Sequence, residues 1–167
     1  MRAFIDSNVT LYALASDDAD PRRGMAMRLL GRHAADQSLV LSVQVLLETY
    51  NVLVRKKKAA PAHALAAMRL LARHEVVSPS ADAVLRALEL AARHRLSIWD
   101  ALIVQAALEA GCDVLYSEDL QAGRHFGALQ VVNPFALQVQ ETGPAYAAPR
   151  KVALRRASKG PAKARKA

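Results

Sequence analysis

The sequence lacks several features that mark secreted, membrane or zinc-binding proteins. It has one cysteine, Cys112, which cannot form an internal disulfide, and we expect it to be a small buried residue in a reducing compartment. No apolar run approaches the roughly 18 residues needed to span a bilayer, and the N-terminus has no signal-peptide pattern. No His and Cys cluster has zinc-ligand spacing. These absences predict a cytoplasmic protein that does not bind a membrane.

The positive charge of the sequence is confined to its C-terminal end. The formal net charge is +8, yet residues 1–141 hold all 15 acids and 15 of the 23 Lys and Arg residues, so they sum to zero. The composition, 53% hydrophobic, predicts one globular domain at 1–140. Because residues 142–167 carry eight bases and no acid, we expect a disordered basic tail at 141–167. This tail either contacts nucleic-acid phosphates without sequence preference or is simply solvated.

Apolar runs alternate with amphipathic helical patterns along the first 136 residues. We expect strands at 3–5, 39–41, 76–77, 113–116 and 129–132, and helices at 9–15, 21–33, 43–57, 61–74, from Ser80 onward, and 98–110. This alternation predicts an α/β fold, a Rossmann-like three-layer sandwich with a short central parallel sheet flanked by helices. Apolar spacing within the helices predicts that the inward-facing residues include Leu65, Val84, Leu88, Ala91 and Trp99.

Four carboxylates occupy related places in this order of elements. Asp6 ends the first apolar run, and Asp119 follows the strand expected at 113–116. Ligands of an open α/β sheet bind beside the carboxyl ends of its strands, so both side chains should point out at that edge. Glu48 and Asp100 lie in helices whose positions three and four residues away hold no Lys or Arg. A partly buried acid without a partner is unfavourable unless a cation meets it.

A divalent cation would balance all four charges at once. Mg²⁺ prefers oxygen ligands and is usually held by one or two carboxylates, waters and substrate phosphate. Ser7, Asn8 and Ser117 would orient the carboxylates and the waters around the ion. Because three of the acids lie near helix starts, we expect them to be ionised at neutral pH.

Each acid taken alone also has a purely structural explanation. Asp6 can form an Asx turn, Asp100 a capping box with Ser97, Asp119 a turn cap, and Glu48 a contact with Arg55 or with another segment. A shared site is favoured because the four acids occur together in related places and because the sequence resembles a known family.

Five segments, in order and spacing, resemble PIN-domain nucleases, and most closely the VapC-type toxins of bacterial toxin–antitoxin modules. These segments cover the chain from residue 1 to 136 and read FIDSN at 4–8, LSVQVLLE at 41–48, SIWDALI at 97–103, LYSEDLQ at 115–121 and VNPF at 132–135. The resemblance implies a PIN-like sandwich, an acidic Mg²⁺ or Mn²⁺ site, cleavage of RNA, a homodimer and a cognate antitoxin. The tail beyond residue 140 departs from the family pattern.

The resemblance also assigns roles by position. Asp6, Glu48, Asp100 and Asp119 would be the catalytic acids, with Asp6, Asp100 and Asp119 holding the metal and Asn8 and Ser117 in support. Glu118 would either assist the metal or face solvent. Arg124 and His125 would either contact the RNA backbone or belong to a solvated loop.

These features together predict a metal-dependent endoribonuclease, a hydrolase that acts as the toxin of a toxin–antitoxin pair. Metal-assisted attack of water on the phosphodiester would be its reaction. The alternatives are an RNA-processing PIN nuclease without an antitoxin and a non-catalytic nucleic-acid-binding module. An aspartyl phosphatase is disfavoured, because it needs a second aspartate where this chain has Asn8.

Overall fold

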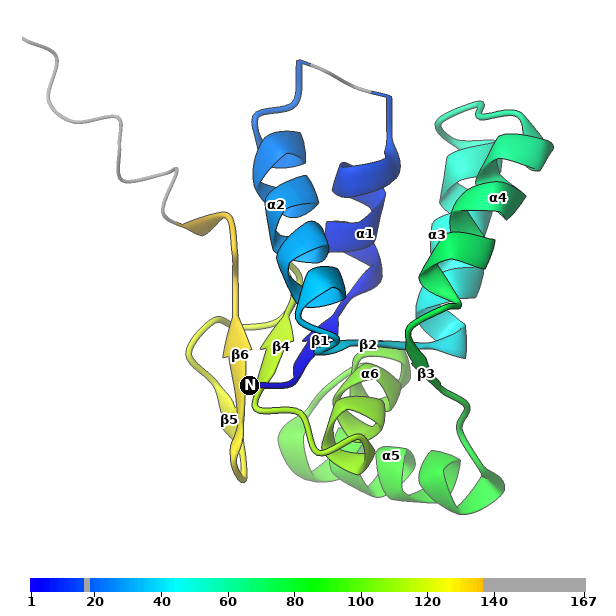
Figure 1. Ribbon diagram of the computed structural model, residues 1–167. Helices are drawn as coiled ribbons and strands as arrows, with labels where there is room; N and C mark the ends of the chain where they lie inside the picture. The colour runs from blue at the N-terminus through cyan, green and yellow to red at the C-terminus, as the bar shows by residue number, and fades with distance from the viewer. Residues whose placement is uncertain (17–18, 137–167) are drawn as a thin grey trace, which may run out of the picture.

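Six strands form a single sheet in the part of the chain that the structure describes (Figure 1). The computed structural model describes residues 1–16 and 19–136, so the predicted tail lies outside it. The strands are β1 (Ala3–Ile5), β2 (Leu39–Ser42), β3 (Glu75–Val77), β4 (Val114–Tyr116), β5 (His125–Phe126) and β6 (Leu129–Val132). Their order is β3-β2-β1-β4-β6-β5, and all neighbours are parallel except β5 and β6.

Strand β1 lies in the middle of the sheet because its residues are apolar without interruption. Ala3, Phe4 and Ile5 are all fully buried. Phe4 pairs with Val40 of β2 on one side and with Leu115 of β4 on the other. A strand covered on both faces needs a continuous apolar run, which is what the sequence provides. The residue that follows β1 therefore lies at the centre of the carboxyl edge.

Helices cover both faces of the sheet. They are α1 (Ser7–Leu14), α2 (Arg22–Ala35), α3 (Val43–Arg55), α4 (Pro61–Leu71), α5 (Ala81–His94) and α6 (Ile98–Glu109). Figure 1 shows α1 to α4 on one side and the α5–α6 pair on the other. The predicted α/β sandwich is confirmed. None of the helices in the described ranges is long and apolar enough to cross a membrane.

Serine side chains start three of the helices, as the sequence predicts. Ser42 Oγ accepts from the Val45 amide at 3.3 Å, Ser80 Oγ from Ala83 at 3.1 Å, and Ser97 Oγ from Asp100 at 3.1 Å. Each bond satisfies an amide that has no partner inside the first helical turn. The start of α6, which carries Asp100, is therefore fixed by its own cap.

The predicted inward faces of three helices are wrong in part. In α5 the buried residues are Ala83 and Ala87, while Val84 and Leu88 are exposed and Ala91 is half-buried. Trp99 is 64% exposed, and Leu65 is exposed as well. The buried alanines of α5 allow a close approach to α6, while Val84, Leu85 and Leu88 are exposed. Spacing alone could not separate the two apolar faces of such a helix.

Two smaller features complete the fold. Strand β5, which the sequence analysis missed, is a two-residue strand that turns back through Gly127 (φ 61°) into β6. Such a strand is too short to show an alternating pattern. Cys112 is 5% exposed, and burial raises the pKa of its thiol to about 12, so the prediction of a small buried residue is confirmed.

Candidate active site

The carboxyl edge of the sheet carries two of the predicted acids on neighbouring strands. Asp6 directly follows β1 and caps α1, and Asp119 lies just beyond the end of β4. Glu48 comes from α3, which starts immediately after β2 on the other side of β1. The parallel sheet thus delivers side chains from three distant segments to one edge, as the sequence predicts.

Asp6 is the most buried of the four acids, with 7% of its surface exposed. Its Oδ1 accepts from the Ser7 amide at 2.6 Å. Its Oδ2 accepts from Ser117 Oγ at 2.7 Å and from Asn8 Nδ2 at 3.3 Å. The three neighbours proposed to orient the carboxylates therefore all contact this carboxylate.

Burial raises the pKa of Asp6 to about 6. The hydrogen bonds from Ser117 and Ser7 act in the opposite direction, whereas the negative charges of Glu48 and Asp119 raise the pKa further. A pKa of about 6 still leaves roughly nine tenths of the groups ionised at pH 7. The electrostatic effect of Glu48 and Asp119 also shows that the three carboxylates lie near one another.

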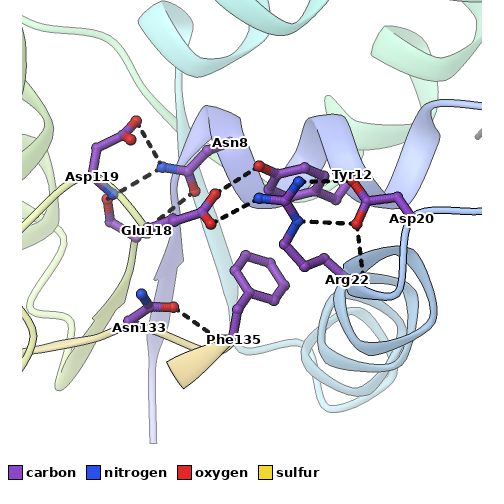
Figure 2. A network of polar contacts seen from close by, with 9 residues as sticks. Asn8, Tyr12, Asp20, Arg22, Glu118, Asp119, Asn133 and Phe135 are labelled. Atoms are coloured by element: carbon purple, nitrogen blue, oxygen red, sulfur yellow. Dashed lines mark hydrogen bonds and ion pairs between the residues drawn. The ribbon is translucent and has the colours of Figure 1, made fainter. Parts of the chain in front are cut away.

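Asn8 and Ser117 join Asp6 to Asp119, and Figure 2 shows the contact between Asn8 and Asp119. Asn8 Nδ2 donates to Asp119 Oδ2 at 3.1 Å as well as to Asp6, and Ser117 Oγ accepts from the Asp119 amide at 3.2 Å. Asn8 Oδ1 accepts from the Glu118 amide at 3.3 Å. One amide side chain at the start of α1 thus holds the whole turn that follows β4.

Glu48 is half-buried and is held from two sides. Its Oε2 accepts from Ser7 Oγ at 2.8 Å, and its Oε1 accepts from Gln44 Nε2 at 2.9 Å. Gln44 Nε2 also lies 3.4 Å from the Trp99 carbonyl, which links Glu48 to the start of α6. Glu48 therefore pairs with Ser7 and Gln44 instead of Arg55, the structural alternative that the sequence left open.

Asp100 lies in the first turn of α6 and contacts Ser97. Its Oδ2 accepts from Ser97 Oγ at 2.8 Å, while its amide donates to the same Oγ. This arrangement is half of the capping-box alternative, because Ser97 caps the Asp100 amide while the Asp100 carboxylate accepts from the Ser97 hydroxyl and not from its backbone amide. The same carboxylate keeps a second oxygen, Oδ1, for another partner.

Asp6, Glu48 and Asp119 share hydrogen-bond partners, whereas the hydrogen bonds of Asp100 go to Ser97. Within residues 1–16 and 19–136, no three His, Cys, Asp or Glu side chains are placed to hold one metal ion, and no ion pair joins the four acids to a Lys or Arg. The Asn8 amide bonds to both Asp6 and Asp119, and Asp100 is turned onto Ser97. Their convergence on a single ion stays a prediction.

Glu118 adopts neither of the two orientations expected from the sequence. Its Oε1 accepts from Arg22 Nη1 and its Oε2 from the Tyr12 hydroxyl, at 2.9 Å and 2.7 Å (Figure 2). Burial and the bond to Glu118 raise the pKa of Tyr12 to about 12, so the hydroxyl remains a donor. The sequence analysis missed Tyr12 and Arg22 as partners of Glu118, because they lie 106 and 96 positions from it in the sequence.

Arg124 has structural partners of its own. Its Nη2 donates to the His94 carbonyl at 2.9 Å, and its guanidinium lies 4.9 Å from the centre of the Phe126 ring. His125 is exposed, and its Nδ1 lies 3.0 Å from the Gly123 carbonyl. The contacts of Arg124 thus connect the start of β5 to the end of α5, and its contact with RNA stays a prediction.

Comparison with known proteins places this geometry in a family. The chain matches the PIN domain model over residues 3–125. It is similar in structure to the Mycobacterium tuberculosis toxin VapC20, described as cleaving the sarcin–ricin loop, with 27% identity, a TM-score of 0.56, and 70% of this chain and 89% of that chain covered. A search of curated proteins found no match.

Two toxin–antitoxin complexes share the fold at lower identity. One, from Klebsiella pneumoniae, is 19% identical with a TM-score of 0.59, covering 79% of this chain and 97% of that chain. The other, a DNA-bound VapBC from Salmonella typhimurium, is 15% identical with a TM-score of 0.56, covering 78% and 96%. Because the PIN domain match spans most of the sequence and the solved structures share its fold, this chain belongs to the PIN-domain family and has the architecture of VapC-type toxins.

Proposed function

We propose that the protein is a metal-dependent endoribonuclease that hydrolyses RNA phosphodiester bonds and acts as the toxin of a toxin–antitoxin pair. One observation carries the proposal. Asp6, Glu48 and Asp119 come from three distant segments and are connected by hydrogen bonds through Ser7 and Asn8. A buried carboxylate beside two others is a costly arrangement, and such sites are characteristic of function.

The chemistry of these side chains fits a hard divalent cation. The donors are carboxylate oxygens with hydroxyl and amide neighbours, which suit Mg²⁺ or Mn²⁺. We propose that Asp6, Asp100 and Asp119 hold the ion. Asp119 is exposed and Asp100 half-buried, so both side chains can turn toward Asp6 when the ion binds. The carboxylates around Asp6 repel one another, and a bound cation would offset this repulsion. Binding of the cation would therefore favour the rearrangement.

The protein's own groups would then position the reactants. A bound divalent cation supplies positive charge to the phosphate and makes water more acidic. Glu48, fixed by Ser7 and Gln44, would align the attacking water and accept its proton. Asn8 and Ser117 would keep Asp6 and Asp119 in place. In-line attack would form a P–O bond to the water oxygen while the P–O bond to one ribose oxygen breaks; that oxygen takes a proton from solvent, and two RNA fragments result.

The test is cleavage of purified total RNA and tRNA by the full-length protein. Wild type should cleave RNA in Mg²⁺ or Mn²⁺ and should lose this activity in EDTA. Asp6→Asn should be inactive even with Mg²⁺ or Mn²⁺ present, while its circular dichroism spectrum stays that of wild type. Asp82→Asn is a matched control, because Asp82 is an exposed aspartate in the first turn of α5. Cleavage by Asp6→Asn at the wild-type rate would refute the assignment.

We further propose a cognate antitoxin as a protein partner. Support comes from the structural neighbours, two of which are described as VapBC assemblies bound to DNA. Expression of this chain alone should arrest growth of a bacterial host, and co-expression of the product of an adjacent small gene should restore it. Growth arrest that no neighbouring gene relieves would favour an RNA-processing nuclease.

We also propose that the protein forms a homodimer through apolar side chains near the start of α6. Val43, Leu47, Val84, Trp99 and Leu102 line one apolar pocket, and Leu47 and Trp99 are about two-thirds exposed. Large apolar groups in this number are typical of a protein interface. Light scattering should show a dimer for wild type and a monomer for Leu47→Asp with Trp99→Asp. Leu65→Asp, at an exposed position of α4, is the matched control.

A further inference from the structure

The carboxylate of Glu118 is held on both of its oxygens by residues outside the acid site. Arg22, the first residue of α2, donates one guanidinium nitrogen to Glu118 and two others to Asp20. The guanidinium carbon lies 4.0 Å from the centre of the Tyr12 ring, whose hydroxyl donates to the second oxygen of Glu118. Figure 2 shows these four side chains in one continuous network.

This network is anchored at both ends. Asp20 Oδ1 accepts from the backbone amide of Arg22 at 3.0 Å as well as from its side chain, so Asp20 and the guanidinium are fixed relative to α2. The Phe135 ring packs edge-on against Tyr12, with centroids 5.2 Å apart. A planar guanidinium with several donors in a fixed geometry can hold two carboxylates at once, which an ammonium cannot.

Glu118 links the network to the acid site through the backbone. It lies between Ser117 and Asp119, and its amide donates to Asn8 Oδ1. The other end of the Asn8 side chain donates to Asp6 and Asp119. A shift of the Glu118 backbone therefore displaces both the Asn8 side chain and the neighbouring Asp119.

We propose that Arg22 is a positioning residue for the acid site. By holding Glu118, it fixes the turn at residues 117–119 and keeps the Glu118 carboxylate away from the acids. The proposal rests on the proposed ribonuclease function, and it goes beyond that function because it assigns a role to a residue outside the acids. Without Arg22, Glu118 keeps only its bond to the Tyr12 hydroxyl, and its carboxylate can turn so that its charge adds to those around Asp6.

Two other roles for Arg22 lead to different outcomes. If Arg22 only stabilised the fold, its loss would lower the free energy of unfolding without a specific dependence on Glu118. If Arg22 bound RNA directly, its loss would raise KM to a similar extent whether or not Glu118 carried a charge. A positioning role through Glu118 predicts that the effects of the two residues are strongly coupled.

The experiment is a double-mutant cycle on RNA cleavage. Arg22→Ala should lower kcat about 10-fold to 100-fold and raise the Mg²⁺ concentration for half-maximal rate, as is usual for groups that orient metal ligands. KM for RNA should remain within about twofold, and Arg22→Lys should restore part of kcat. In a Glu118→Gln background, Arg22→Ala should change kcat by less than about threefold. Arg28→Ala, at an exposed arginine of α2, is the control.

A second readout does not depend on cleavage. The amides of Asp119 and Leu120 donate to Ser117 Oγ, so their hydrogen exchange reports on the turn. Both should exchange faster in Arg22→Ala than in wild type or Arg28→Ala. Unchanged exchange, an unchanged kcat, or a KM effect independent of Glu118 would overturn the inference. If wild type does not cleave RNA, the proposed function fails, and the exchange rates still test the role of Arg22.

Discussion

Asp6 and Asp119 are joined by hydrogen bonds that cross between neighbouring strands, whereas Asp100 bonds to Ser97 at the start of its own helix. On the first side, Asn8 and Ser117 connect residues more than a hundred positions apart in the chain. On the second side, the contact joins two residues that are three positions apart in the sequence and belongs to a helix cap. The two sides of the site are therefore built from long-range and local interactions respectively.

This difference distinguishes the part of the site that is formed by the fold itself from the part that is formed locally. The Asp6 side is fixed once β1 and β4 pair, because its donors come from the residues that follow these strands. The Asp100 side is oriented by a local bond to a side chain that is easily exchanged for another partner. We therefore expect Asp100 to change its side-chain conformation more than Asp6 when a cation binds.

The largest expected effect comes from removing an acid on either side. Asp119→Asn and Asp100→Asn should each lower kcat by at least about 100-fold, more than is usual for groups that only orient metal ligands. Isothermal calorimetry of Mn²⁺ binding checks the cause, since both variants should bind the ion more weakly than Asp82→Asn. If Asp100→Asn cleaved RNA at the wild-type rate, Asp100 would not be part of the active site.

Loss of the long-range bridge should have the next largest effect. Asn8→Ala removes the donor shared by Asp6 and Asp119, and the expected fall in kcat is about 10-fold to 100-fold. Asn51→Ala, an exposed asparagine of α3, should retain wild-type activity. Equal activities of the two variants would show that the bridge is not needed for cleavage.

The burial of Asp6 predicts a pH-dependent stability difference. Its pKa is higher in the folded protein, at about 6, than its ordinary value of 3.8, so the folded state binds the proton more tightly. This stabilisation is complete below about pH 4 and is lost as the pH rises through 6. Relative to wild type in EDTA, Asp6→Asn should gain about 2 kcal/mol in unfolding free energy between pH 4 and pH 7.

Urea unfolding at several pH values measures this difference. The sign follows from the raised pKa, and an acid with a lowered pKa would give the opposite slope. A difference between Asp6→Asn and wild type that stays constant with pH would mean that Asp6 is not strained by its burial. Added Mg²⁺ should favour wild type, because only wild type has the full set of acids for the ion.

The smallest expected effect is on the local side. Ser97→Ala removes the cap of α6 and should lower the unfolding free energy by about 1 kcal/mol. Because Asp100 then loses its partner, it is freer to meet a cation, and kcat should fall by less than it does in Asn8→Ala. A larger loss of kcat in Ser97→Ala would show that the cap orients Asp100 in the active state.

The sequence predicts the parts of this protein that short patterns determine. The buried strand at 3–5, the serine caps and the acids that follow the strands all have local signals, and the family resemblance is confirmed by the PIN domain match. These signals need no knowledge of how distant segments pack. They locate the carboxyl edge of the sheet and place Asp6 and Asp119 on it.

The remainder depends on packing between distant segments. Arg22 reaches Glu118 across 96 positions, and the sequence alone does not relate the two. Helix α6 has apolar residues on all sides, so residue spacing did not indicate which of them are exposed. Trp99 is one of the exposed residues. In α5 the buried residues are Ala83 and Ala87, which pack against α6, and residue size in the sequence did not indicate that the alanine face is the buried one.

The burial of Cys112 has a practical consequence for following the site in solution. It is the one cysteine of the sequence, and its shielded thiol stays protonated and unreactive near neutral pH. Fluorophores or spin labels can therefore be attached to cysteines introduced at the exposed positions of Asn51 and Trp99 without first removing Cys112. The spacing between two such labels would report how α3 and α6 respond as magnesium is titrated in.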